Sequence, residues 1–338
     1  MQFFPLLTLP HLALDQILRS MEIKDLVLLA SISPVLKKYV PLLRIPSGGY
    51  RIHLGCLNSK VETPGHTFYT YSRPSIGPCD SMVQVSDYVN DMKDLFTGNV
   101  EYFNVCPSLL WFNIEETTDI LAIGNAKYEY SNWMVDQFED VVEENLNALL
   151  DNVDFKKGLV ISGPKEIRTE HKKVFNVDWL RISHTEWITM EILNKMENKV
   201  IFLDDVGFTA QQINDFLRDL KHGRGNQNLQ VITFTQRWND EEMFTILEDL
   251  DIVENQKEQI YKFSKEDSKF DMSDFLLFGS SEGVPFWNSF DLTRIDGVRC
   301  SIVFDTDAVS VYVWNQQKES KKRSNDNGEG PSTKIIRV

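Results

Sequence analysis

Residues Phe3 to Val40 read FFPLLTLPHLALDQILRSMEIKDLVLLASISPVLKKYV, and this stretch decides how the N-terminal part of the chain folds. Apolar residues of a first helix recur there at the spacing of one helical face: Leu14, Ile17, Leu18 and Met21. The following segment, from Leu26 to Ile32, is apolar on nearly every side of a helix and must be covered from two directions. The stretch therefore predicts short helices with more apolar surface than about forty residues can bury.

A third helix is expected to begin at Ser33-Pro34. The serine hydroxyl can cap free backbone N–H groups, and proline at the first helical position loses no hydrogen bond. Leu36, Val40 and Leu43 give this helix its apolar face. A module of this size usually relies on disulfides, a metal or a partner to complete its core. Because the segment holds no cysteine, we expect a partner; the alternative is that these helices belong to the chain's own core.

One series within this stretch follows a fixed order: Leu9-Pro10, Leu14, Ile17-Leu18, Met21, Asp25-Leu26 and Ile32-Ser33. The series resembles an F-box, the three-helix module that docks on the Skp adaptor of cullin-based ubiquitin ligases. Phe4-Pro5-Leu6-Leu7 ahead of it is similar to the nematode version of the motif, although Leu36 stands where many F-boxes carry tryptophan. The resemblance implies that the adaptor is bound by Leu9, Pro10, Leu14, Ile17, Leu18, Leu26 and Leu29.

The charge of the chain is unevenly distributed. The net charge is −15 over 338 residues, but residues 316–338 carry six basic and three acidic side chains, which leaves −18 for the body. Such a body repels phosphate backbones and disfavours nucleic acid as the main partner. It favours a protein target with a basic surface, because opposite potentials speed encounter.

Cysteine usage indicates a reducing compartment, the cytosol or the nucleus. Cys56, Cys79, Cys106 and Cys300 lie far apart without a C-x-x-C pair, and no N-x-S/T glycosylation site occurs. No apolar run approaches eighteen residues, so no membrane span is expected.

The middle of the chain carries a weak repeat. Short apolar segments are centred near Val160, Arg181, Phe202 and Val231, at intervals of 21, 21 and 29 residues. Helical patterns fill the last two gaps, over 188–196 and 210–222. Alternating strands and helices at this period indicate irregular leucine-rich-repeat-like units; ordinary α+β layering is the alternative.

A second series of residues runs from 179 to 234: Ser183, Trp187-Ile188-Thr189, Ile201-Phe202-Leu203, Thr209, Ile213-Asn214, Phe216-Leu217, Gly223 and Leu229. It resembles the type 2 F-box-associated domain of nematode F-box proteins. Residues 291–314 are similar to the end of the folded region in those proteins, and the turn Asp305-Thr306-Asp307 between alternating segments predicts a closing β-hairpin.

The predicted fold is therefore α+β in three parts. Residues 1–45 form a three-helix F-box, and residues 46–315 form an F-box-associated substrate-recognition region of strand and helix units with its core motif at 179–250. Residues 316–338 have almost nothing to bury and are predicted to be a disordered tail.

Motifs that suggest catalysis are incomplete. Gly279-Ser280-Ser281-Glu282-Gly283 matches a nucleophile elbow, but Pro285 blocks the helix that must follow and no histidine lies downstream. The acids Asp204-Asp205 end an apolar strand without a phosphate-binding loop elsewhere. His184 and Glu186 echo the H-x-E of zinc deaminases, but the second half of that motif is absent. We therefore expect no catalytic residue, metal or cofactor.

Together the two resemblances imply a non-catalytic, substrate-recognition subunit of a Skp–cullin–F-box ubiquitin ligase. The chain would bind the Skp-family adaptor, and through it a cullin, at one end and an unidentified protein target at the other. The alternative is a scaffold or protein-interaction module that binds the adaptor without promoting ubiquitination.

Overall fold

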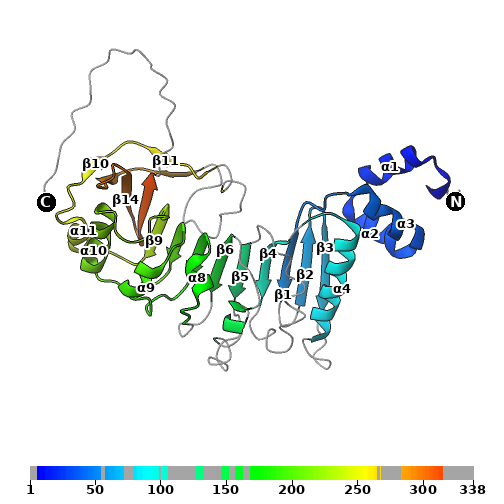
Figure 1. The fold of residues 1–338 in the computed structure, drawn as a ribbon, viewed down its shortest axis with the longest axis horizontal. Helices are drawn as coiled ribbons and strands as arrows, with labels where there is room; N and C mark the ends of the chain where they lie inside the picture. The colour runs from blue at the N-terminus through cyan, green and yellow to red at the C-terminus, as the bar shows by residue number, and fades with distance from the viewer. Residues whose placement is uncertain are drawn as a thin grey trace, which may run out of the picture. The chain divides into compact units, whose positions relative to one another are not determined.

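The computed structural model describes residues 6–54, 58–71, 79–98, 100–105, 127–131, 143, 146–148, 150–151, 157–162, 168–264, 267 and 283–314 (Figure 1). The chain divides into two compact units, residues 1–156 and 157–338, and each is described by itself. The predicted tail, residues 316–338, lies outside the described ranges. Most of the nucleophile-elbow match, residues 279–282, does so too.

Unit 1 begins with the three α-helices that the sequence predicts and with two 3-10 helices that it does not predict. They are the 3-10 helix η1 (Leu6–Thr8), α1 (His11–Ser20), α2 (Ile23–Ile32), α3 (Pro34–Tyr39) and the 3-10 helix η2 (Val40–Leu43). The Leu36 N–H donates to the Ser33 hydroxyl at 3.4 Å and Pro34 is the first residue of α3, as the capping argument predicts. The Tyr39 hydroxyl donates to the Asp15 carboxylate and links α3 to α1.

A mixed sheet follows in the same unit. Its strands are β1 (Tyr50–Leu54), β2 (Asn58–Thr63), β3 (His66–Tyr71), β4 (Val100–Val105) and β5 (Lys127–Ser131). They lie in the order β5-β4-β1-β2-β3, with β1, β4 and β5 parallel and the β1-β2-β3 pairs antiparallel. The helix α4 (Cys79–Leu95) packs on this sheet, where Tyr88 stacks on Phe68 of β3 with the ring centres 4.1 Å apart.

Unit 2 is built on four parallel strands in sequential order: β6 (Gly158–Ser162), β7 (Trp179–Ile182), β8 (Val200–Leu203) and β9 (Val231–Thr235). The connections carry α8 (Lys172–Asn176), α9 (Met190–Lys195) and α10 (Ala210–Lys221), and α11 (Asp240–Leu247) follows β9. The predicted strand segments are confirmed, and so are the helices in the last two gaps. The short helix α8 in the first gap was not predicted.

Antiparallel strands extend this sheet on the far side of β9. They are β10 (Val253–Asn255), β13 (Ser289–Thr293), β14 (Arg299–Asp305) and β15 (Ala308–Trp314), in the order β10-β13-β14-β15-β9. The predicted closing hairpin is β14-β15, in which Asp305 opposes Ala308 across the two-residue turn Thr306-Asp307. A separate two-stranded sheet contains β11 (Gln259–Tyr261) and β12 (Val284–Phe286).

Both faces of the parallel strands are covered (Figure 1). On the helical face, the Phe234 ring makes edge contacts with Phe208 and with Phe216 of α10, at 5.8 and 5.7 Å between ring centres. On the opposite face, Trp179 of β7 and Val231 of β9 belong to one buried cluster with Tyr261 of β11 and Phe286 of β12. Burial on two faces explains why these strands read as continuous apolar runs rather than as alternating ones.

An ion-pair network ties the segment after β11 to the start of the parallel strands. The Lys157 ammonium lies 2.6 Å from a carboxylate oxygen of Asp267 and 3.3 Å from one of Asp178, which also receives Lys199 at 2.9 Å. Burial opposes the ionisation of Asp267, but hydrogen bonds from Lys157 and Ser264 outweigh it and lower the pKa of this carboxyl.

We predict that acid weakens unit 2 through Asp267. Because the folded-state pKa lies below the ordinary value of 3.8, the stabilisation is complete above pH 3.8 and is lost as pH falls through the lower folded value. The Asp267→Asn variant should unfold more easily than the wild type at pH 7, by about 1–3 kcal/mol. Urea unfolding followed by tryptophan fluorescence between pH 2 and pH 7 would show the two proteins converging in acid; parallel pH profiles would contradict the assignment.

Candidate functional site: an apolar helical surface and a strand-end pocket

The N-terminal helices leave large apolar side chains in water. Six of the eleven exposed large hydrophobic residues in the described ranges lie in this segment: Leu7, Leu12, Leu28, Ile32, Val35 and Leu42. Leu12 is 81% exposed, Ile32 69% and Leu28 60%. An exposed apolar cluster of this kind is typical of a protein–protein contact surface.

Helix α2 shows why the apolar surface is left over. Leu26 and Ala30 face inward and are buried, whereas Leu28 and Ile32, four residues apart on another face, are exposed. A helix that is apolar on nearly every side needs cover from two directions. Within the described part of the chain, the exposed face has no such cover, as the sequence predicts.

The seven residues predicted to bind an adaptor differ in burial. Three are buried inside the helical module: Leu14, Leu18 and Leu26. The other four are partly or fully exposed: Leu9, Pro10, Ile17 and Leu29. The buried three hold the helices together and offer no side-chain surface to a partner while the module stays folded. The exposed Leu12, which the prediction missed, lies outside the periodic stripe of α1, and that position is the signal that could have identified it.

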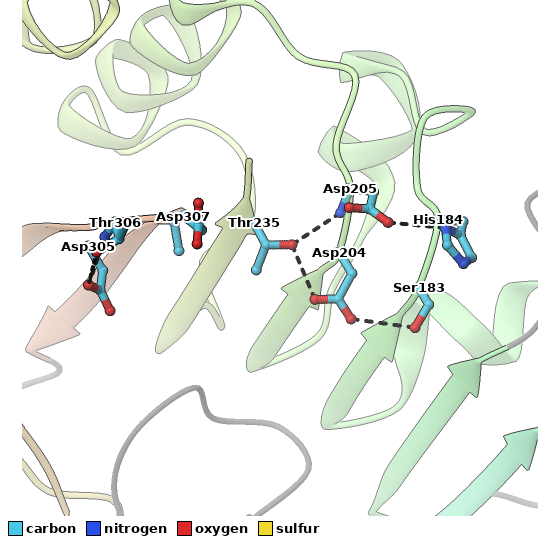
Figure 2. Close-up of a pocket in the computed structure, with 9 residues that line it drawn as sticks. Ser183, His184, Asp204, Asp205, Thr235, Asp305, Thr306 and Asp307 are labelled. Atoms are coloured by element: carbon cyan, nitrogen blue, oxygen red, sulfur yellow. Dashed lines mark hydrogen bonds and ion pairs between the residues drawn. The ribbon is translucent and has the colours of Figure 1, made fainter. Parts of the chain in front are cut away.

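A second candidate lies in unit 2, where a pocket of about 590 Å³ opens at the carboxyl ends of β7, β8 and β9 (Figure 2). Its lining consists of Ser183, His184, Asp204, Asp205, Thr235 and the hairpin residues 305–308. The carboxyl ends of parallel strands are where ligands of open α/β sheets usually bind. In the sequence, Asp204 and Asp205 are simply acids at the end of a strand, because no local pattern brings residues 305–307 next to them.

The Asp204 side chain is held in place by three neighbouring side chains. Its carboxylate receives the Arg181 guanidinium through Nε at 3.0 Å and Nη2 at 2.9 Å. It also lies 3.4 Å from the Ser183 hydroxyl and 3.2 Å from the Thr235 hydroxyl, so one side chain joins the ends of three strands. The guanidinium of Arg181 is in turn held over the Phe202 ring at 4.5 Å. The floor of the pocket is therefore ordered in advance of any ligand.

The rim of the pocket is acidic. His184 Nδ1 lies 3.1 Å from an Asp205 carboxylate oxygen, and Asp205 is more exposed than its partner. Across the pocket, Asp307 pairs with Arg237 at 2.8 Å, and Asp305 accepts from the backbone N–H and the hydroxyl of its neighbour Thr306. Four carboxylates and two paired arginines leave a net charge of −2 when His184 is neutral.

No three side chains among the described His, Cys, Asp and Glu residues are arranged to hold a metal ion. His184 lies in the pocket, but Glu186 of the H-x-E pattern is exposed and does not line it. No helix in the described ranges has the length and apolar character needed to cross a membrane.

Comparison with known proteins identifies one segment of the chain. Residues 169–234 match a family described as F-box associated, so the chain carries an F-box associated domain. This segment holds β7, α9, β8 and α10, and it ends one residue before Thr235 of the pocket. No curated protein and no solved structure matches the chain.

We predict that burial, not apolar character alone, decides which leucines of α1 stabilise the helical module. Leu18→Ala removes a side chain that is 0% exposed and should destabilise the module by about 2–5 kcal/mol. Leu12→Ala on the same helix removes an exposed side chain and should change stability by less than about 0.5 kcal/mol. Hydrogen exchange of the α1 and α2 amides in the full chain measures both values, and equal losses would show that Leu12 is packed in solution.

Proposed function

We propose that this chain is a substrate-recognition subunit of a Skp–cullin–F-box ubiquitin ligase. In this proposal residues 1–45 are the F-box, which binds the Skp-family adaptor, and residues 46–315 recognise a protein target around a core motif at 179–250. The F-box associated domain at residues 169–234 supports the second part. The single observation that carries the first part is the exposed apolar surface of the N-terminal helices.

The docking surface we propose is a revision of the residues expected from sequence. It keeps the exposed or partly exposed Leu9, Pro10, Ile17 and Leu29. It adds the most exposed apolar residues of α1 and α2, which are Leu12, Leu28 and Ile32. Leu14, Leu18 and Leu26 are assigned to the internal core that keeps these side chains in position.

The binding free energy of such a surface is shared among several side chains. Covering four or five leucine-sized side chains contributes on the order of 6–15 kcal/mol before costs. Loss of translational and rotational freedom opposes binding by about 4–15 kcal/mol. A single alanine substitution is therefore expected to weaken the complex, and several together are needed to abolish it.

The role proposed for the chain is positional and includes no bond-making step of its own. The ligase transfers ubiquitin to target lysines, and a subunit that holds the target nearby converts a chance encounter into a near-unimolecular step. We further propose that the parallel strand–helix units form a leucine-rich-repeat-like array, whose strand ends and connecting loops are available for target binding.

We predict that the exposed apolar side chains are required for adaptor binding. The triple variant Leu12→Ser, Leu28→Ser and Ile32→Ser should lose co-elution with the Skp adaptor and cullin in size-exclusion chromatography after co-expression. The combined change Leu9→Ala, Pro10→Ala and Ile17→Ala should have the same effect in a separate variant.

The matched control removes apolar surface elsewhere. Phe244 and Ile295 are 60% and 78% exposed in unit 2, and the double variant Phe244→Ser, Ile295→Ser should bind the adaptor as the wild type does. Co-elution that survives both N-terminal variants, while their circular dichroism matches the wild type, would remove the docking assignment. With an adaptor complex in hand, modification of lysines on a captured target separates a ligase subunit from a scaffold.

A further inference from the structure

The pocket at the carboxyl ends of β7, β8 and β9 is the feature of unit 2 that the adaptor-binding proposal leaves unused. Its volume of about 590 Å³ lies within the range of small-ligand sites and accommodates one long side chain with its adjoining backbone. The lining comes from two parts of the chain: the ends of β7, β8 and β9, between residues 183 and 235, and the β14-β15 turn, which begins 70 residues after Thr235. Figure 2 shows both groups facing the same hollow.

We propose that this pocket holds a basic side chain, arginine or lysine, of the protein target. That the ligand belongs to a protein target rests on the proposed function, whereas its basic character is inferred from the residues that line the pocket. The carboxylates of the lining and the hydroxyl groups of Ser183, Thr235 and Thr306 supply acceptors for a guanidinium or ammonium group. The same threonine side chains carry methyl groups, which suit the methylene stem of such a side chain.

The acids of the pocket have separate roles in this arrangement. Asp204 is already neutralised by Arg181 and acts as the ordered floor. Asp205 faces His184, Asp305 accepts from the Thr306 backbone N–H, and the two carboxylates lie on opposite sides of the hollow. A basic side chain that enters between them is attracted by both carboxylates, whereas an acidic or neutral one is not.

A metal ion is a weaker explanation for the same acids. The described His, Cys, Asp and Glu side chains include no group of three placed to ligate one ion. The carboxylates instead line a hollow of about 590 Å³, a space far larger than one cation needs. Carboxylates that are separated around a large opening suit the guanidinium or ammonium group of a long, flexible side chain.

The test uses the full chain labelled with ¹³C at alanine methyl groups, because Ala308 reports from inside the pocket. The probe is N-acetyl-arginine methylamide, and its neutral isostere is N-acetyl-citrulline methylamide. We expect the arginine compound to shift the Ala308 methyl resonance saturably and the citrulline compound to leave it unchanged. Absence of a saturable shift with the arginine compound, or an equal shift with both compounds, would overturn the proposal.

Paired variants separate a local site from the general negative charge of the protein. Asp205→Asn with Asp305→Asn removes the two available charges and should raise Kd for the arginine compound by roughly tenfold, about threefold for each exposed contact. Glu197→Gln with Glu258→Gln removes two exposed acids outside the pocket and should change Kd less than about twofold. Equal weakening by both pairs would mean that only the overall charge attracts the probe.

The same proteins distinguish failure of this inference from failure of the proposed function. The pocket variants should still co-elute with the Skp adaptor, because their substitutions lie outside the N-terminal helices. Loss of arginine binding together with intact adaptor binding in the pocket variants supports the site. A wild-type chain that binds the arginine compound but ignores the adaptor would refute the ligase role and leave the pocket assignment standing.

Discussion

The structure of unit 2 depends on one constraint, that parallel strands with apolar side chains on both faces must be covered on both. Helices cover one face, where Phe216 of α10 meets Phe234 of β9. The other face is covered by the β11-β12 layer, where Tyr261 and Phe286 share a buried cluster with Trp179 of β7. The carboxyl ends of β7, β8 and β9 lie at the edge of this double cover. Polar residues occupy those ends because they stay in contact with water, and the pocket forms there.

The same constraint explains how much of the fold can be predicted from sequence. A strand buried on both faces is a short continuous apolar run, so GLVIS, WLRIS and VIFLD mark β6, β7 and β8 within a few residues. Capping residues mark helix starts equally well: Ser33-Pro34 begins α3, and Thr209 with Gln212 forms the capping box of α10. The pairing of β15 with β9 is different, because no local pattern fixes which distant strand completes a sheet. The pocket cannot be predicted from the sequence for the same reason, since Asp204 and Asp305 come close together only after β15 has paired with β9.

The helical surface was predictable in kind but not residue by residue. Periodicity shows that residues 26–32 carry apolar side chains on too many sides, and hence that a surface remains exposed. It does not show which side faces inward. That choice is made by the neighbouring helices, which bury Leu26 and Ala30 and leave Leu28 and Ile32 in water. Sequence motifs of this kind therefore mix core and surface residues, and only the packed structure separates Leu18 from Leu12.

On the proposed function, the two candidate surfaces suit the two tasks of a recognition subunit. The apolar helical surface gains affinity by removing hydrocarbon from water, a contribution that salt hardly weakens and that suits a lasting complex with an adaptor. The acidic pocket gains selectivity from exposed charges, which salt screens within about 8–10 Å. Contacts of that kind form quickly and are individually weak, because solvent competes for each carboxylate. A subunit that stays on its adaptor while it exchanges targets needs both kinds of contact. Hydrophobic burial suits the contact with the adaptor, and reversible charge pairing suits the contact with the target.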